Sequence, residues 1–227
     1  MKAMILAAGR GERMRPLTDA TPKPLLPVGG KPLIVWHIER LAAAGVHDIV
    51  INHAWLGAQI EAALGDGSQW GVRIAYSAEA VALETAGGIA QALPLLGSAP
   101  FLLISADIYT DYPLAQLVAV AQTMVQDQAR LAHVVMVDNP PYHPIGDWAL
   151  SDGRIDPAGA DKLCYANLAV LKPAVVDGVA PGSIARLGPI LAQAAATGQV
   201  SGEHYGGGWY NVGTPDELAA ADHAARR

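Results

Sequence analysis

A short apolar run that ends in a glycine turn rich in arginine constrains this chain most. Residues 1–8 read MKAMILAA and continue directly into GRGERMRP at residues 9–16. A strand that ends in glycines exposes backbone N–H groups, and cations beside them strengthen the attraction for an anion, so the pattern predicts a polyphosphate site. Ligands of mainly parallel sheets bind beyond the carboxyl ends of the strands, which is where this turn is expected to lie.

Positive charge is concentrated in the same segment. Residues 1–32 contain six Lys or Arg and two acidic residues, whereas the whole chain has a net charge of −6. Proteins that bind nucleic acid usually spread basic residues over a whole face, so this distribution argues against that class. It favours a small anionic ligand instead.

The composition predicts a globular domain with a large core. Of the 227 residues, 52% are hydrophobic and 16% are charged, which is ample for burial. The single cysteine, Cys164, excludes an internal disulfide and a site made of several cysteines. No apolar run reaches the length of a membrane span. We therefore expect a soluble cytoplasmic protein, a monomer or small homo-oligomer, with no membrane or nucleic-acid partner.

Apolar runs bounded by turn residues predict strands that alternate with helices. Strands are expected at residues 3–7, 48–52, 72–77, 101–105 and 132–137, and helices at residues 33–44, 56–64 and 86–93. This order indicates a mainly parallel sheet that is covered on both faces. We expect the three tryptophans of this half, Trp36, Trp55 and Trp70, to belong to the core.

The second half of the chain is less regular. A hairpin is expected at residues 148–155, a strand at 162–171 and a helix at 189–197. Thr214, followed by proline and by Glu217, predicts the start of a final helix. No linker-like tract or internal repeat divides the sequence, so we expect one domain whose β-rich extension forms the far wall of a cleft.

Two familiar phosphate-binding loops do not fit. The chain has no Gly-Lys-Ser/Thr triplet, which a Walker A loop requires. A dinucleotide fingerprint needs a small residue where this chain has Met14, and an acidic residue near the end of the second strand, where it has Asn52 and His53. What remains is LAAGRGERMRPLT at residues 6–18, followed by PKPLLP at 22–27. This pattern closely resembles the signature of the sugar-1-phosphate nucleotidylyltransferases.

The resemblance extends along the chain. ETAGG at residues 84–88, the Ala-Asp pair at 106–107 and WYNVGTP at 209–215 fall on further motifs of that family. Within the family, INHAWLG at 51–57 and SGEHY at 201–205 most resemble the short uridylyltransferases that act on N-acetylmuramate 1-phosphate.

The resemblance implies a Rossmann-like three-layer α/β/α fold with a mainly parallel, mixed central sheet and a β-rich sugar-binding extension. It implies one domain over residues 1–227: a nucleotide-binding part at about 1–110, a sugar-binding part at about 111–205, and a metal motif with the last helix at 206–227.

The resemblance also implies the site residues, each at the position that matches a family motif. The expected catalytic residues are Arg15 and Lys23; the nucleotide-binding residues are Leu6, Ala7, Ala8, Gly9, Gly11, Glu79, Glu84 and Thr85; the sugar-binding residues are Gly146, Tyr165 and Asn167; and the Mg²⁺ ligands are Asp107 and Asn211.

The implied reaction is transfer of a uridylyl group from UTP to a sugar 1-phosphate, favoured as N-acetylmuramate 1-phosphate, with Mg²⁺ as cofactor and pyrophosphate as by-product. The sugar phosphate is already ionised at neutral pH, so it can attack without a general base. Two alternatives remain open. One is a guanylyl- or thymidylyltransferase acting on a hexose 1-phosphate. The other is a non-catalytic nucleotide-sugar sensor, because Asn211 is uncharged where many relatives have aspartate.

Overall fold

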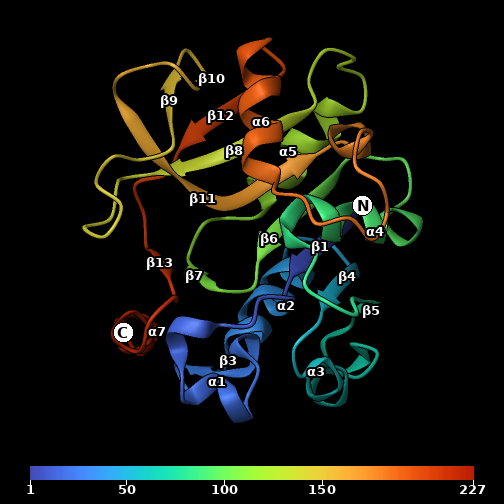
Figure 1. Ribbon diagram of the computed structural model, residues 1–227, viewed down its shortest axis with the longest axis vertical. Coiled ribbons are helices and arrows are strands. Elements are labelled where there is room, and N and C mark those ends of the chain that lie inside the picture. The colour runs from blue at the N-terminus through green and yellow to red at the C-terminus, as the bar shows by residue number, and fades with distance from the viewer.

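A nine-stranded mixed sheet forms the centre of the protein (Figure 1), as seen in a computed structural model that describes residues 1–227. The strand order is β5-β4-β1-β6-β11-β8-β12-β10-β9. Its strands are β1 (Lys2–Leu6), β4 (Asp48–His53), β5 (Arg73–Ala78), β6 (Phe101–Ser105), β8 (Ala132–Val137), β9 (Trp148–Ser151), β10 (Arg154–Asp156), β11 (Lys162–Leu171) and β12 (Val200–His204). Two small ribbons pair β2 (Pro27–Val28) with β3 (Lys31–Pro32), and β7 (Ile108–Thr110) with β13 (Trp209–Asn211).

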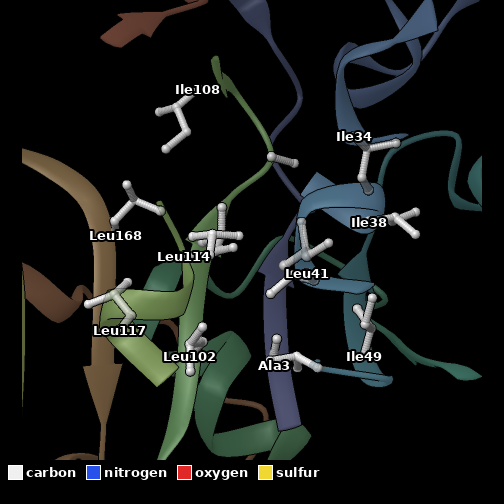
Figure 2. Packing of buried hydrophobic residues seen from close by; sticks show 14 of the residues in the cluster. Ala3, Ile34, Ile38, Leu41, Ile49, Leu102, Ile108, Leu114, Leu117 and Leu168 are labelled. Carbon is white, nitrogen blue, oxygen red and sulfur yellow. The ribbon is translucent and has the colours of Figure 1, made fainter. Parts of the chain in front are cut away.

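Helices cover both faces of this sheet. The helices that do so are α2 (Leu33–Ala43), α3 (Gly57–Leu64), α4 (Glu84–Leu96), α5 (Ala115–Met124) and α6 (Leu187–Ala196). The short α1 (Leu17–Ala20) belongs to the amino-terminal segment, and α7 (Pro215–Ala225) packs against that segment. Side chains alternate along β1, so that Ala3 and Ile5 join one core with α2, α3 and α5, while Met4 joins a second core with α4 and α6. Figure 2 shows Ile38 and Leu41 of α2 in the first of these cores. The expected three-layer fold is confirmed.

The sheet changes from parallel to antiparallel pairing at β6. Strands β5, β4, β1 and β6 are parallel, whereas β11 runs antiparallel to both β6 and β8. The register of β11 against β8 shifts between Tyr165 and Ala169, and Asn167 has φ +58° within this irregularity. A bulge of this kind redirects the side chains of one strand, so residues expected at the sugar lie on a distorted stretch.

The last helix returns to the amino-terminal segment. Ala221 of α7 shares a small third core with Met14 of the arginine-rich turn and Val28 of β2. In Figure 1 the red helix α7 lies beside the blue amino-terminal region. Met14 is fully buried there, so packing between the chain ends fixes the base of the turn that was expected to hold phosphate.

Most expected elements are present, with small shifts at their ends. The hairpin β9–β10 and strand β11 lie where they were expected, and the Thr214 hydroxyl accepts a hydrogen bond from the Glu217 N–H at 3.3 Å. The helix expected at 86–93 is longer, running from Glu84 to Leu96 through Pro94. It continues because the buried Leu96 extends its apolar face. No helix combines the length and the apolarity that crossing a bilayer requires.

His37 of α2 is a buried titratable group whose Nε2 atom has no hydrogen-bond partner. Burial lowers its pKa from 6.5 to about 4, and Arg40 adds to this effect while Ile108 and Asp107 oppose it. The unfolded chain therefore takes up this proton at a higher pH than the folded chain.

We predict that stability rises with pH between about 4 and 6.5 because of His37, by on the order of 3 kcal/mol at most. The stability is complete above this window and is lost as the pH falls through it. Urea unfolding at several pH values in this window gives the free energy of unfolding, which should depend less steeply on pH in His37→Leu than in the wild-type protein. The same substitution at the exposed His47 serves as control. An unchanged slope in His37→Leu would contradict the assignment.

Candidate active site

A cavity of about 300 Å³ opens at the carboxyl ends of β1, β4 and β6. It is lined by Leu6, Ala7, Ala8, Gly9, Arg10, Lys23, Pro24, Asn52, Ala82, Glu84, Thr85, Ser105, Ala106 and Asp107. Eight residues of the expected site are among them, namely Leu6, Ala7, Ala8, Gly9, Lys23, Glu84, Thr85 and Asp107. The cavity therefore lies at the edge of the sheet where a ligand was expected, beyond the carboxyl ends of the parallel strands.

The glycine turn has one closed and one open position. Gly11 has φ +70°, and a Cβ atom there would lie 2.9 Å from the Thr18 side chain. The Thr18 hydroxyl also donates to the Gly11 carbonyl at 2.8 Å. Gly9, in contrast, has nothing within 4 Å of an added Cβ. Gly11 thus shapes the turn from behind, while Gly9 leaves space in front for a ligand.

Arg10 is a lining residue that the sequence analysis did not select. Its guanidinium donates to the Thr18 carbonyl at 2.7 Å, pairs with Asp19 at 2.9 Å and lies 3.8 Å from the centre of the Trp55 ring. The expectation that Trp55 belongs to the core is wrong. The residue is 39% exposed, and the Arg10 guanidinium lies over its ring. The signal that could have identified Arg10 was its place directly after Gly9.

Arg15, expected to be catalytic, lies outside the residues that line the cavity. Its guanidinium pairs with Glu12 at 2.8 Å and with Asp19 at 3.5 Å, and the side chain is 51% exposed. Exposed ion pairs of this kind contribute little to stability. Arg15 shares the Asp19 carboxylate with Arg10, and Arg10 lines the cavity.

Lys23 and Asp107 form an ion pair inside the cavity. Lys23 Nζ lies 2.6 Å from Asp107 Oδ2, and the lysine side chain is only 13% exposed. Lys23 begins a 3₁₀ turn after the arginine-rich loop, whereas Asp107 follows β6. Two residues that are 84 positions apart thus meet as opposite charges in a sheltered place, where their attraction is stronger than in water.

Asn211 is held beside Asp107 by backbone pairing. The Val212 N–H donates to the Asp107 carbonyl at 2.7 Å, and Asn211 pairs with Ile108 where β13 meets β7. The two expected Mg²⁺ ligands therefore sit on neighbouring segments. Lys23 engages Oδ2 of Asp107 and leaves Oδ1 available. A carboxylate and an amide oxygen are hard donors that suit Mg²⁺, which usually retains several other positions for water and phosphate.

A buried hydrogen-bond network supports the backbone of the loop that follows β1. The Ala7 N–H donates to Asn52 Oδ1 at 2.9 Å, and Asn52 Nδ2 donates to Glu79 Oε1 at 2.6 Å. The other carboxylate oxygen of Glu79 accepts from the Leu83 N–H at 2.8 Å. Glu79, expected at the nucleotide, is 6% exposed and does not line the cavity. Both of its oxygens are engaged by the chain, so it positions the loop from behind.

Hydrogen bonds to the residues around the start of α6 hold the ETAGG segment, residues 84–88, in place. The N–H groups of Ala86 and Gly87 both donate to the Ala185 carbonyl, at 2.9 and 3.1 Å. Thr85 Oγ1 accepts from the Leu187 N–H at 2.7 Å. Thr85 does not cap α4, because Leu83 occupies the cap position of that helix. Its hydroxyl instead satisfies the first turn of α6, which has no side-chain cap of its own.

The three residues expected at the sugar lie outside the cavity described above. Gly146 has φ +68°, and an added Cβ there would lie 2.9 Å from the Leu163 carbonyl. Tyr165 and Asn167 belong to β11, on the irregular stretch of that strand. The Tyr165 hydroxyl is buried without a hydrogen-bond partner.

Comparison with known proteins places the chain among enzymes of one kind. The family described as nucleotidyl transferase matches residues 2–143. An N-acetylmuramate alpha-1-phosphate uridylyltransferase of Neisseria meningitidis serogroup B is 52% identical over 99% of this chain and 98% of its own length. The enzyme of the same name from Caulobacter vibrioides is 37% identical over 97% and 95%. A Bacillus anthracis structure assigned as a glucose-1-phosphate thymidylyltransferase superposes with a TM-score of 0.86 at 22% identity, covering 100% of this chain and 95% of that one.

We predict that Glu79→Gln destabilises the protein although the two side chains have the same shape. Both partners of Glu79, the Asn52 amide and the Leu83 N–H, are donors. A glutamine would present its NH₂ group to one of them and leave a buried donor unpaired, at a cost of about 1–3 kcal/mol. Urea unfolding measures this difference. Asp177→Asn, at an exposed position, is the matched control, and equal stability of the two variants would refute the network.

Proposed function

Because the chain belongs to the nucleotidyl transferase family, we propose that it transfers a uridylyl group from UTP to N-acetylmuramate 1-phosphate. The observation that carries this proposal is the 52% identity with the Neisseria enzyme across nearly the whole of both chains. The products are the UDP-sugar and pyrophosphate. The free, buried Cys164 agrees with action in a reducing compartment such as the cytoplasm.

The lining of the cavity supports binding of the triphosphate at the glycine turn. Gly9 leaves open space, while Arg10 and Lys23 contribute positive charge at the same opening. Arg15 is paired with two exposed acidic side chains and shares one of them, Asp19, with Arg10. Backbone N–H groups and cations together favour an anion at the end of a strand. The base then lies toward Leu6, Glu84 and Thr85, across the same cavity.

The reaction needs charge stabilisation more than proton transfer. An oxygen of the sugar 1-phosphate attacks the α-phosphorus of UTP, a new P–O bond forms, and the bond to the β-phosphate oxygen breaks to release pyrophosphate. Negative charge builds up on the α-phosphoryl and leaving oxygens. Lys23 and Arg15 are the groups we assign to balance that charge, because cations placed beside developing negative charge stabilise the transition state.

The Lys23–Asp107 ion pair gives this cavity two states. When a triphosphate enters, Lys23 has a second anion within reach and can leave the carboxylate. Asp107 and Asn211 are then the residues that would hold Mg²⁺. When bound, that ion supplies positive charge to the phosphate oxygens. The two charged groups thus pair with each other before the substrates bind and interact with the substrates afterwards.

We predict that UTP with N-acetylmuramate 1-phosphate gives the highest kcat/KM among four nucleoside triphosphates crossed with several sugar 1-phosphates. Pyrophosphate release in the presence of Mg²⁺ measures this. N-acetylglucosamine 1-phosphate is the matched acceptor, since it lacks only the lactyl ether of muramate. Faster turnover of GTP with mannose 1-phosphate would overturn the assignment of substrates. Absence of turnover with any pair would favour the sensor.

Arg15→Ala is expected to lower kcat by about 10²–10³-fold, the usual loss when one charge-stabilising group is removed. The fold should be unaffected, because the side chain is half exposed and its partners are surface acids. Arg73→Ala, which removes an exposed arginine paired with Asp48 at the far end of the strands, is the control. Near-normal kcat in Arg15→Ala would remove this residue from the mechanism.

A further inference from the structure

Three side chains with different metal-binding atoms meet beside the loop that precedes β9. The ligand atoms of His143, Asp147 and Cys164 all lie within 4.8 Å of one another, and His143 Nε2 is 3.1 Å from Asp147 Oδ1. Cys164 is buried, whereas His143 and Asp147 have side chains that are 39% and 37% exposed. The cluster thus has a buried sulfur at its base and an opening to solvent.

We propose that His143, Asp147 and Cys164 form a binding site for a divalent transition-metal ion of the Zn²⁺ type. One nitrogen, one oxygen and one sulfur donor are the set that zinc accepts, with three protein ligands and an open fourth position. Its donor set differs from that of Asp107 and Asn211, whose oxygen donors suit Mg²⁺. The proposal does not depend on which nucleotide or sugar the protein uses.

The spacing of the donors is close to what such an ion requires. Zinc bonds of about 2.0–2.3 Å in a tetrahedron hold neighbouring donors roughly 3.4–3.6 Å apart. The present separations, from 3.1 Å up to at most 4.8 Å, bracket these values. Rotation of the half-exposed His143 side chain is enough to adjust them. Two negative ligands, a thiolate and a carboxylate, also balance the charge of the ion.

The surroundings already orient the carboxylate. Asp147 Oδ2 accepts a hydrogen bond from the Tyr165 N–H at 2.8 Å, and the Asp147 N–H donates to the Leu163 carbonyl at the same distance. Outer hydrogen bonds of this kind hold a ligand in place for a metal. Burial, and then the neighbouring Asp147 carboxylate, raise the pKa of the Cys164 thiol to about 12. A bound cation reverses that effect, because a coordinating thiol is deprotonated.

Occupation of the site has a structural consequence for the catalytic side of the cleft. The ion ties the loop, through His143 and Asp147, to Cys164 of β11. Tyr142 of this loop interacts with the side chain of Asn211, and it is close enough to Glu217 and Cys164 to feel their charges. The metal therefore fixes the segment that reaches toward the metal motif near the carboxyl end.

Titration with Co²⁺ tests the proposal directly, because a thiolate bound to cobalt produces a charge-transfer absorption band that oxygen ligands do not. Protein stripped of metal with a chelator should develop this band until one equivalent is bound, and added Zn²⁺ should abolish it. Cys164→Ser should lose the band. Asp107→Asn, which changes the predicted Mg²⁺ site and its ion pair with Lys23 but none of the three cluster residues, should keep it. Circular dichroism checks that each variant is folded.

His143→Gln provides a second readout, since this half-exposed position tolerates substitution without disturbing the core. Loss of one of three ligands should weaken Co²⁺ binding at least about tenfold while the sulfur remains. Absence of a thiolate band in the wild-type protein would show that the three side chains form only a hydrogen-bonded cluster. A band of equal strength in Cys164→Ser would likewise overturn the proposal.

Discussion

The ion pair between Lys23 and Asp107 is the interaction on which the rest of the site depends. It joins the amino-terminal loop to the end of β6 across the cavity, at 2.6 Å between Nζ and Oδ2. Opposite charges in a sheltered pocket attract strongly but also lose hydration. An incoming polyanion and its cation can replace both partners at once. We therefore propose that these two charges neutralise each other until the substrates bind and then interact with the substrates.

The backbone around this pair is fixed from several directions before any ligand binds. The buried Met14 packs in the third core and anchors the turn. Asn52 accepts a hydrogen bond from the Ala7 N–H, and the Ala185 carbonyl accepts hydrogen bonds from two N–H groups in the first turn of α4. Fixed donors cost little reorganisation during a reaction, which is the advantage of a preorganised site. The exposed Arg15 is an exception, since its partners are surface acids. The structure thus combines backbone groups held by buried contacts with an arginine held only by surface ion pairs.

Local pattern was enough to predict the parallel strands of the first half, helices α2, α3 and α4 and the glycine turn, because apolar runs, glycines and caps act over a few residues, but it did not predict α5 or β12. It could not predict what depends on contacts distant in sequence. Trp55 was expected in the core, yet Arg10 covers it at the surface. Glu79 was expected at the nucleotide, but its oxygens meet Asn52 and Leu83 inside the protein. The meeting of His143 with Cys164 likewise depends on tertiary folding. Residue types suggested chemistry, and only the fold decided which partners they met.

A crystal structure with a non-hydrolysable UTP analogue and Mg²⁺ tests the central claim most directly. The quantity to measure is the separation of Lys23 Nζ and Asp107 Oδ2, which is 2.6 Å without ligand. The account predicts that this ion pair opens, with Lys23 on a phosphate oxygen and Asp107 on the metal ion. A triphosphate bound while the ion pair stays closed, or bound away from the glycine turn, would contradict it.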